Sequence, residues 1–300
     1  MTEERKQEIL EIIRNTNRRP AQTGKPLYPE EIMAYPNLCE EMESISRTVD
    51  GFSYRMDILR AKNRGENCPL FINIHGGGFI GPHRENDTYF SAYMADQIHG
   101  IAVDLDYTLS DAAPYPVALH QCMDALDYVA EHANTWGASA KDISVGGYSA
   151  GGALTAAMGI CCAERGGFVP KLQILSYPPL EYRIPDQYKI DAYDRQIGME
   201  RCKAFADLYF DDKKENFEDI HNSPLYAPRE ILAKQPKTLI LSAGLCNFRY
   251  EDEDYAICLA DAGAEVILKR FPEASHGFIP HFMDGWKEAA DLMVREILEK

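Results

Sequence analysis

The sequence predicts an α/β fold in which a mostly parallel β-sheet is covered by helices on both faces. Three observations predict it. Short apolar runs such as "LFINI" and "KTLILSAG" alternate with longer segments of helical periodicity. Several of these runs end in glycine or other small residues, as a strand does when it leads into a tight turn. Strands that are apolar along their whole length are typical of parallel sheets buried on both sides.

The chain begins with one predicted amphipathic helix, because isoleucine and leucine recur at helical spacing between residues 9 and 13. Two strand-like runs follow, "SISRTV" and "SYRMDILRA". Asp50 and Gly51 lie between them. An Asp-Gly pair between two such runs is a strong signal for a β-hairpin.

Strands and helices then alternate to the end of the chain. The predicted elements are an apolar run that ends in glycines at 69–78, a strand at 100–107, a helix at 117–133, a strand into a tight turn at 143–152, a helix at 153–165, strands at 171–179 and 237–244, a helix at 250–263, a strand at 264–271 and a closing helix at 286–300. A polar and aromatic segment interrupts the alternation. We expect one domain over residues 1–300, with residues 1–45 and about 180–235 as helical cap elements above the C-terminal edge of the sheet.

Composition restricts the partners of this chain. Its 300 residues are 45% hydrophobic, which suits one large α/β domain, and its net charge is -16. That charge disfavours nucleic acid and anionic membrane surfaces. No stretch approaches the ~20 apolar residues of a membrane span, and the charged N-terminus lacks an apolar signal sequence. We therefore expect a cytoplasmic protein that binds neither nucleic acid nor membrane.

Eight cysteines are scattered along the chain without any C-x-x-C spacing. This spacing indicates neither a zinc site nor a redox motif. We expect free, mostly buried thiols in a reducing compartment.

A G-x-S-x-G pattern occupies residues 147–151, with Ser149 at its centre. A predicted strand precedes it and an alanine-rich predicted helix follows it, which is the context that a nucleophile turn requires. Small residues around the serine permit the sharp, strained turn that presents its hydroxyl group. The pattern indicates a nucleophilic serine rather than a glycine-rich turn that only packs.

Two further motifs supply partners for such a serine. The "HGGGF" segment follows a predicted strand, and its glycines suit a loop that offers backbone N–H groups to an oxyanion. We expect these donors at Gly77, Gly78 and Ala150, with His75 holding the loop in shape. His276 follows the last predicted strand in "EASHGF" and is the predicted general base, because sites form where parallel strands end.

Together, "HGGGF", "DYTLSDAAPYPVAL", "GGYSAGG", "SPLYA" and "HGF" resemble the hormone-sensitive-lipase-like esterases of the α/β-hydrolase fold, over about residues 45–300. The resemblance implies an eight-stranded, mostly parallel sheet, a helical cap and hydrolysis of carboxylic esters with short acyl chains. It implies no cofactor and no metal. Tyr148 stands where the family usually has an aspartate before the nucleophile.

One departure concerns the acid that orients the base. The family usually reads A-G-x-D-P-L-x-D-E after its seventh strand, and this chain has Cys246 at the position of the first aspartate. A thiol, with a reference pKa of ~8.5, is a poor substitute for a carboxylate. Glu251 is the predicted replacement, with Glu181 and Asn247 as alternatives, and a dyad without a third group is the fourth option. Asp252 is expected on a solvated helix face.

These motifs predict a serine carboxylesterase that acts on a small-molecule ester. Aromatic residues of the predicted cap suit either an acyl pocket or a platform for an acetylated sugar; they are Tyr177, Tyr182, Tyr188, Tyr193, Phe205, Tyr209 and Phe210. The alternative is a ligand-binding protein on the same fold without a complete triad, since function depends on the site and not on the fold. An isologous homodimer would be ordinary for such a protein.

Overall fold

The computed structural model describes residues 1–16, 28–184 and 197–299. Parts of both predicted cap segments, together with Tyr188 and Tyr193, lie outside these residues. The described strands form one eight-stranded sheet: β1 (Glu43–Val49), β2 (Phe52–Arg60), β3 (Cys68–Ile74), β4 (Ile101–Asp106), β5 (Ala138–Tyr148), β6 (Leu172–Ser176), β7 (Lys237–Ala243) and β8 (Val266–Phe271).

The strand order in this sheet is β1-β2-β4-β3-β5-β6-β7-β8. The pairs β1/β2 and β2/β4 are antiparallel, and the other pairs are parallel. The predicted eight-stranded, mostly parallel sheet is therefore confirmed. The predicted hairpin is also confirmed, because Val49 pairs with Phe52 and both turn residues, Asp50 and Gly51, have positive φ.

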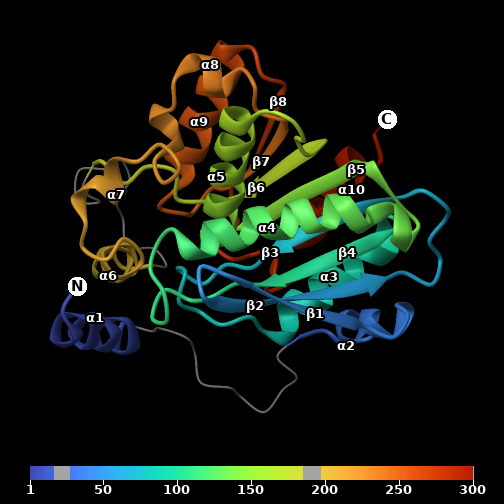
Figure 1. Cartoon of the computed structure of the whole chain (residues 1–300), viewed down its shortest axis with the longest axis horizontal. Coiled ribbons are helices and arrows are strands. Elements are labelled where there is room, and N and C mark those ends of the chain that lie inside the picture. Colours follow the sequence, from blue (N-terminus) through green and yellow to red (C-terminus); the bar gives the residue numbers. More distant parts are fainter. Residues whose placement is uncertain (17–27, 185–196, 300) are drawn as a thin grey trace.

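Helices cover both faces of the sheet (Figure 1). The described α-helices are α1 (Glu3–Asn15), α2 (Glu30–Met33), α3 (Glu85–Gln97), α4 (Val117–His132), α5 (Ala150–Arg165), α6 (Met199–Tyr209), α7 (Lys214–Glu218), α8 (Arg229–Leu232), α9 (Arg249–Ala262) and α10 (Trp286–Leu298). Short 3-10 helices lie at Tyr35–Leu38, Ala133–Trp136 and Pro224–Tyr226.

The hydrophobic core has two main layers, one on each face of the sheet. One layer joins α4 and α5 to the sheet and includes Leu70, Ile72 and Ile74 of β3. The other layer joins α3 and α10 to the sheet and includes Phe71 of the same strand. Successive side chains of a strand point to opposite faces, so this apolar strand supplies both layers at once.

Helices α1 and α6 pack against each other at one end of the molecule (Figure 1). Ile9 and Ile13 of α1 form a small apolar cluster with Ala204 and Leu208 of α6. Arg5 of α1 also pairs with the carboxylate of Asp207 on α6 at 3.1 Å, next to this cluster. The first helix and the middle of the chain thus meet far from each other in sequence.

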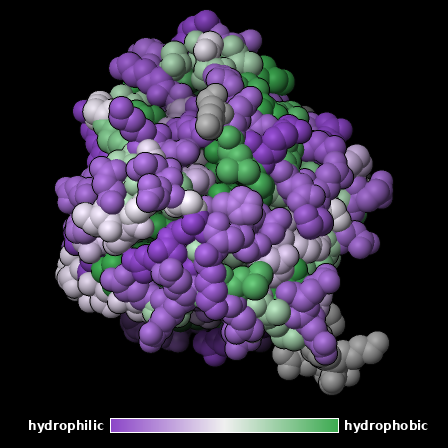
Figure 2. All heavy atoms as spheres, turned by 90° about the vertical axis from the view of Figure 1, so that its right-hand side faces the viewer, coloured by the Kyte–Doolittle hydropathy of each residue, from purple (hydrophilic) through white to green (hydrophobic). Residues whose placement is uncertain are grey.

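The opposite edge of the molecule is mostly hydrophilic, with scattered hydrophobic side chains (Figure 2). Among the described residues, no helix is long and apolar enough to cross a membrane.

Candidate active site

Ser149 lies in the turn between β5 and α5, at the C-terminal end of the central strands. Its φ is +56° and its ψ is -123°, a conformation that a residue with a side chain rarely adopts. A Cβ atom on Gly151 would lie 2.0 Å from the Ile74 carbonyl oxygen, and one on Gly147 would lie 2.4 Å from the backbone of Gly151. Only glycine fits at these two positions, so the flanking glycines allow the strained serine to form.

His276 lies in the loop after β8, and its imidazole faces the serine. The distance from Nε2 of His276 to Oγ of Ser149 is 2.9 Å. If the hydroxyl group donates to Nε2, the neutral imidazole carries its hydrogen on Nδ1. This tautomer is the one in which a histidine takes a proton from a serine.

Cys246 occupies the other side of this imidazole. It follows β7, and its Sγ is 3.1 Å from Nδ1 of His276. The backbone N–H of Phe248 also donates to Sγ, at 3.4 Å. Burial raises the pKa of the Cys246 thiol well above its usual value, with Asp252 adding to the rise. The sulphur is therefore an uncharged acceptor for the Nδ1 hydrogen.

The H-G-G-G loop lies directly after β3 and beside the serine turn. Gly77 and Gly78 have φ values of +120° and +63°. A Cβ atom on Gly78 would lie 2.4 Å from the ring of Phe205, which covers this part of the loop. Among the described residues, the N–H groups of Gly77, Gly78 and Ala150 donate to no recorded acceptor.

Comparisons with known proteins identify the family of this chain. A family model described as the α/β-hydrolase fold matches residues 71–280. The chain belongs to this family. Esterase LipI of Mycobacterium tuberculosis is 30% identical over 71% of this α/β-hydrolase and 66% of its own length. The carboxylic ester hydrolase LipN of the same organism is 31% identical over 75% of this chain and 61% of its own length.

This α/β-hydrolase thus spans 61% to 66% of the length of these two relatives. Among solved structures, the hyperthermophilic esterase of Pyrobaculum calidifontis superposes with a TM-score of 0.78 at 25% identity, over 99% of this chain and 98% of that one. Carboxyl esterase 2 of Tuber melanosporum reaches 0.80 at 21% identity, over 97% of both chains, which shows the shared fold. The expected family and fold class are confirmed.

Glu251, the predicted acid of this α/β-hydrolase, faces a backbone turn. Its Oε2 accepts hydrogen bonds from the N–H groups of Leu180 at 2.8 Å and Glu181 at 3.0 Å. A carboxylate that accepts two backbone donors is engaged in shaping the loop after β6. The geometry thus speaks against the prediction that Glu251 orients His276, because the group recorded on Nδ1 is the Cys246 thiol.

The two alternatives to Glu251 are engaged elsewhere as well. Oε1 of Glu181 accepts from the N–H of Ile184 at 2.9 Å. Nδ2 of Asn247 donates to the carbonyl oxygen of Ile197 at 3.0 Å. Cys246 was considered a poor candidate because a thiol forms weak hydrogen bonds. Its position in the family motif, at the place of the usual aspartate, nevertheless indicated the residue that contacts His276.

His75 lies behind the oxyanion loop and away from the serine. Its Nδ1 is 2.8 Å from the carbonyl oxygen of Gly76, and its ring stacks on Tyr107 with centroids 4.3 Å apart. Tyr107 in turn donates from its hydroxyl group to the carbonyl oxygen of His75 at 3.1 Å. Burial lowers the pKa of His75 to about 4, so this imidazole is neutral near pH 7. These contacts suit a residue that holds the loop.

A cavity of about 630 Å³ opens above Ser149 and His276. Its walls come from the oxyanion loop, the start of α3, the end of α1, helix α6 and the loops after β6, β7 and β8. The side chains on these walls include Ile13, Arg84, Asn86, Asp87, Tyr148, Tyr182, Arg201, Phe205 and Phe248. The described parts of both predicted cap segments therefore border the cavity. No cluster of three or more metal-binding side chains occurs among the described residues.

The protonation of His276 sets the expected pH dependence. Burial, with a smaller like-charge effect from His281, lowers the pKa of His276 to about 3. A base must be neutral to accept a proton, so a lowered pKa moves the acid limb to lower pH. We expect kcat/KM for a p-nitrophenyl ester to stay within about twofold from pH 8 to pH 5, where a base of pKa ~6.5 would lose roughly thirtyfold.

The same histidine makes the fold less stable in acid. Below the unfolded pKa of ~6.5, the unfolded chain binds a proton at this residue that the folded protein does not. Stability is therefore lost as the pH falls from about 6.5 towards 3. Circular dichroism at each pH shows whether the protein is still folded, and only rates measured on folded protein report the pKa of His276. An acid limb with a midpoint near 6.5 in folded protein would contradict the assignment.

Proposed function

We propose that this α/β-hydrolase is a carboxylic-ester hydrolase that acts on short-chain acyl esters. The observation that carries the proposal is the 2.9 Å contact between Ser149 Oγ and His276 Nε2, in a turn beside three backbone N–H groups without a recorded acceptor among the described residues. A hydroxyl group, a base and oxyanion donors in one cavity are the components of acyl transfer. The esterases named above support this assignment by similarity.

In this proposal, Ser149 attacks the acyl carbonyl carbon while His276 takes its proton. The N–H groups of Gly77, Gly78 and Ala150 bind the oxyanion, which is typically worth about 3 kcal/mol for each such donor. His276 then returns the proton to the departing alcohol. Water, deprotonated by the same imidazole, releases the acid from the acyl-enzyme and regenerates the serine.

Cys246 supplies only part of what a carboxylate would supply. It accepts the Nδ1 hydrogen of His276 and so fixes the tautomer, but as a neutral group it adds no charge against the imidazolium that forms. The proposed enzyme therefore has an oriented base with weak electrostatic support. We expect a turnover below that of an esterase with an intact acid.

The side chains that line the cavity favour an ester with a short acyl group and a polar alcohol. The ring of Phe205 lies directly over Gly78, next to the place where the acyl carbonyl would bind. The polar side chains of Arg84, Asn86 and Asp87 line another part of the wall. Such groups can hydrogen-bond to hydroxyl groups, which favours a hydroxylated alcohol such as an acetylated sugar.

The test is hydrolysis of p-nitrophenyl acetate and butyrate, together with labelling of Ser149 by a fluorophosphonate. We expect release of p-nitrophenol and a single label on this serine, identified by mass spectrometry. Heat-denatured protein should take up no label. If native protein neither releases p-nitrophenol nor takes up the label, the proposal fails and the ligand-binding alternative replaces it.

Replacing Phe205 should widen the acyl end of the cavity. We expect the Phe205→Ala variant to raise the ratio of kcat/KM for p-nitrophenyl octanoate over butyrate by about tenfold, the effect of burying about two of the four additional CH2 groups at about 0.8 kcal/mol each. Phe217→Ala is the matched control, since Phe217 is a half-buried phenylalanine of α7 that does not line the cavity. An unchanged ratio would show that Phe205 does not bound the acyl site.

The cysteines bear on the cellular compartment of the protein. All eight cysteines are free thiols, which supports a reducing compartment such as the predicted cytoplasm. The homodimer remains a prediction from the general frequency of such assemblies.

A further inference from the structure

Two aromatic rings pack against the imidazole of His276. The ring of Tyr177 lies 5.0 Å from it between centroids, at an interplanar angle of 66°, and the ring of Phe248 lies 5.6 Å from it at 76°. Edge-to-face pairs at such distances stabilise their rings beyond the effect of burial alone. Ser149 and Cys246 contact the two nitrogen atoms of the same imidazole, so the aromatic contacts add packing to its hydrogen bonds.

Tyr177 is firmly held at the C-terminal end of β6. Its side chain is fully buried, and its ring also packs on that of Phe278, with centroids 5.5 Å apart. Its backbone N–H donates to the carbonyl oxygen of Leu241 at 2.9 Å. Its φ is +41°, a value that a residue with a side chain rarely adopts. Strained residues of this kind cluster at functional sites, where the surrounding structure holds them in place.

Phe248 is fixed by the start of α9. Its carbonyl oxygen accepts from the N–H of Asp252 at 3.0 Å, and its own N–H donates to Cys246 Sγ at 3.4 Å. Its side chain is buried and lines the cavity. The residue whose backbone contacts the thiol therefore also places a ring against the imidazole.

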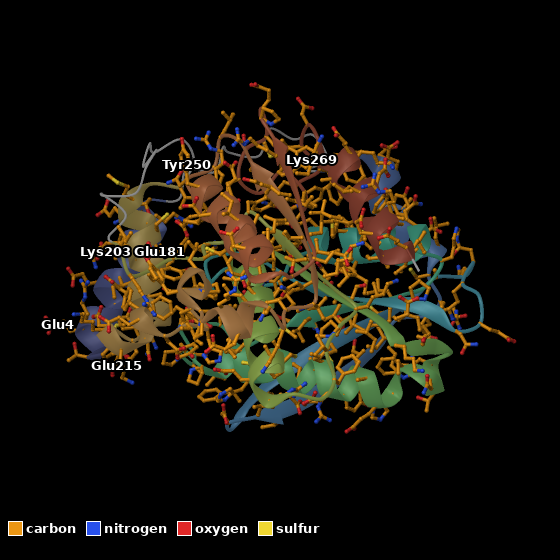
Figure 3. All side chains as sticks on the ribbon, turned by 90° about the horizontal axis from the view of Figure 1, so that it is seen from above. Glu4, Glu181, Lys203, Glu215, Tyr250 and Lys269 are labelled. Carbon is orange, nitrogen blue, oxygen red and sulfur yellow. The ribbon has the colours of Figure 1, made fainter. Side chains whose placement is uncertain are left out.

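The segments that carry the two rings are joined to each other. Glu251, in the first turn of α9, accepts hydrogen bonds from the N–H groups of Leu180 and Glu181 in the loop after β6. Figure 3 accordingly shows Tyr250, in the same turn of α9, on the side of the molecule where Glu181 also lies. The loop after β6 and the start of α9 thus form one unit beside His276.

The imidazole needs such support because a thiol stands at the place of the usual carboxylate. The torsion that turns a histidine ring has a broad, roughly twofold minimum, so contacts decide the ring orientation. A carboxylate would form a charge-assisted hydrogen bond, which is roughly twice as strong as a neutral one. The uncharged thiol of Cys246 restrains the ring less. A rotated ring would carry Nε2 away from Ser149 and prevent proton transfer.

We propose that Tyr177 and Phe248 are positioning residues, which hold the imidazole of His276 in the orientation that a carboxylate fixes in a complete triad. The inference rests on the proposed function, because it concerns the same proton transfer from Ser149. The proton moves from Oγ of Ser149 to Nε2, and no bond forms or breaks at either ring. The two rings act only through the position of the imidazole.

The first test is a double-mutant cycle on p-nitrophenyl butyrate. We expect Phe248→Leu, which keeps an apolar side chain and removes the ring, to lower kcat about tenfold with KM within about twofold. In a Cys246→Asp background, the same substitution should lower kcat by less than about threefold, because the carboxylate then orients the imidazole. An equal loss in both backgrounds would show that Phe248 contacts the substrate or supports the fold. That result would overturn the proposal, as would no loss in the wild-type background.

Phe282→Leu is the matched control for this cycle. Phe282 is 9% exposed, against 8% for Phe248, and its ring has two edge-to-face partners, Tyr28 and Trp286. It does not line the cavity, and no ring contact with His276 is recorded for it among the described residues. Its thermal midpoint should fall by an amount similar to that of Phe248→Leu, while its kcat should match the wild type. An equal loss of kcat in both variants would contradict a specific role of Phe248.

Variants of Tyr177 test the ring separately from its hydroxyl group. Tyr177→Phe keeps the ring and should leave kcat within about twofold of the wild type, whereas Tyr177→Leu should lower it about tenfold. A tenfold loss in Tyr177→Phe would assign the effect to the hydroxyl group and contradict the role of the ring. If Tyr177→Leu does not fold, the cycle at Phe248 still decides.

The second test does not depend on turnover. In ¹⁵N-histidine NMR at pH 7, the signals of His276 are identified by their loss in His276→Gln. We expect sharp, well-separated signals from its two ring nitrogens in the wild type. In Phe248→Leu they should broaden and move towards each other, because the ring samples more than one orientation. The Cys246→Asp background should restore sharp signals, and Phe282→Leu should leave them unchanged.

The outcomes of the two tests separate the proposals. Altered His276 signals in Phe248→Leu, in a protein whose wild type hydrolyses no ester, would support the positioning role and contradict the proposed function. Ester hydrolysis by the wild type, with unchanged His276 signals in Phe248→Leu, would do the reverse.

Discussion

Replacing Ser149 with alanine should lower kcat for p-nitrophenyl butyrate by about 10⁴ to 10⁶-fold. Ser149 is the only group in the proposed site that forms a bond to the substrate, and loss of a nucleophile in a serine hydrolase typically has an effect of this size. The Ser149→Ala protein should also take up no fluorophosphonate. Its thermal stability should be close to that of the wild type, because the substitution removes one hydroxyl group from a strained turn.

Ser139→Ala is the matched control for this experiment. Ser139 lies at the other end of the same strand, β5, and does not line the cavity. Its turnover should match that of the wild type. If Ser149→Ala keeps more than about a tenth of the wild-type rate while remaining folded, another group is the nucleophile and the proposed mechanism is wrong.

Replacing Cys246 with aspartate should raise kcat by about tenfold. The new carboxylate would lie next to Nδ1 of His276 and stabilise the imidazolium, and the N–H of Phe248 would donate to it. Loss of the charge in an intact triad can lower the rate about 10⁴-fold. The gain should be smaller here, because the site is buried and a new carboxylate would lose its hydration there.

The charge, not the size, of residue 246 is what this experiment measures. Cys246→Ser is the matched control, because it keeps a small neutral group that both donates and accepts. Its kcat should lie within about threefold of the wild type, whereas Cys246→Asp exceeds it. A Cys246→Asp variant no faster than the wild type would show that the thiol site does not gain from a charge and that the base is supported in another way.

Much of the site could be predicted from the sequence, because its parts are local. The G-x-S-x-G turn and the H-G-G-G loop each need glycines at fixed spacing from a strand, and the structure gives Ser149 and Gly78 the positive φ values that such turns require. His276 could be selected because loops that follow parallel strands meet at one edge of the sheet. These inferences depend on strand order and spacing along the chain, and both can be read without coordinates.

The third group of the site could not be predicted in this way. Glu251 and Asp252 are neighbours in sequence, and both are buried, although Asp252 was expected on a solvated helix face; Glu251 hydrogen-bonds to the backbone after β6, whereas no such bond is made by Asp252 among the described residues. Successive residues of a helix point about 100° apart, so their surroundings depend on how α9 packs against the sheet. The sequence shows that acidic residues occur in this segment, but it does not show which way each side chain points.

The sequence by itself indicated the family through its motifs, and it predicted the parallel sheet and the meeting of Ser149 with His276, because hydrophobic period and glycine spacing specify strands and tight turns. Only the tertiary structure decided that a thiol contacts Nδ1 of His276, that Glu251 shapes a loop and that Asp252 is buried. Those contacts depend on how the sheet brings together the loops that follow β6, β7 and β8. Contacts between segments separated by tens of residues arise from packing, and no local pattern records them.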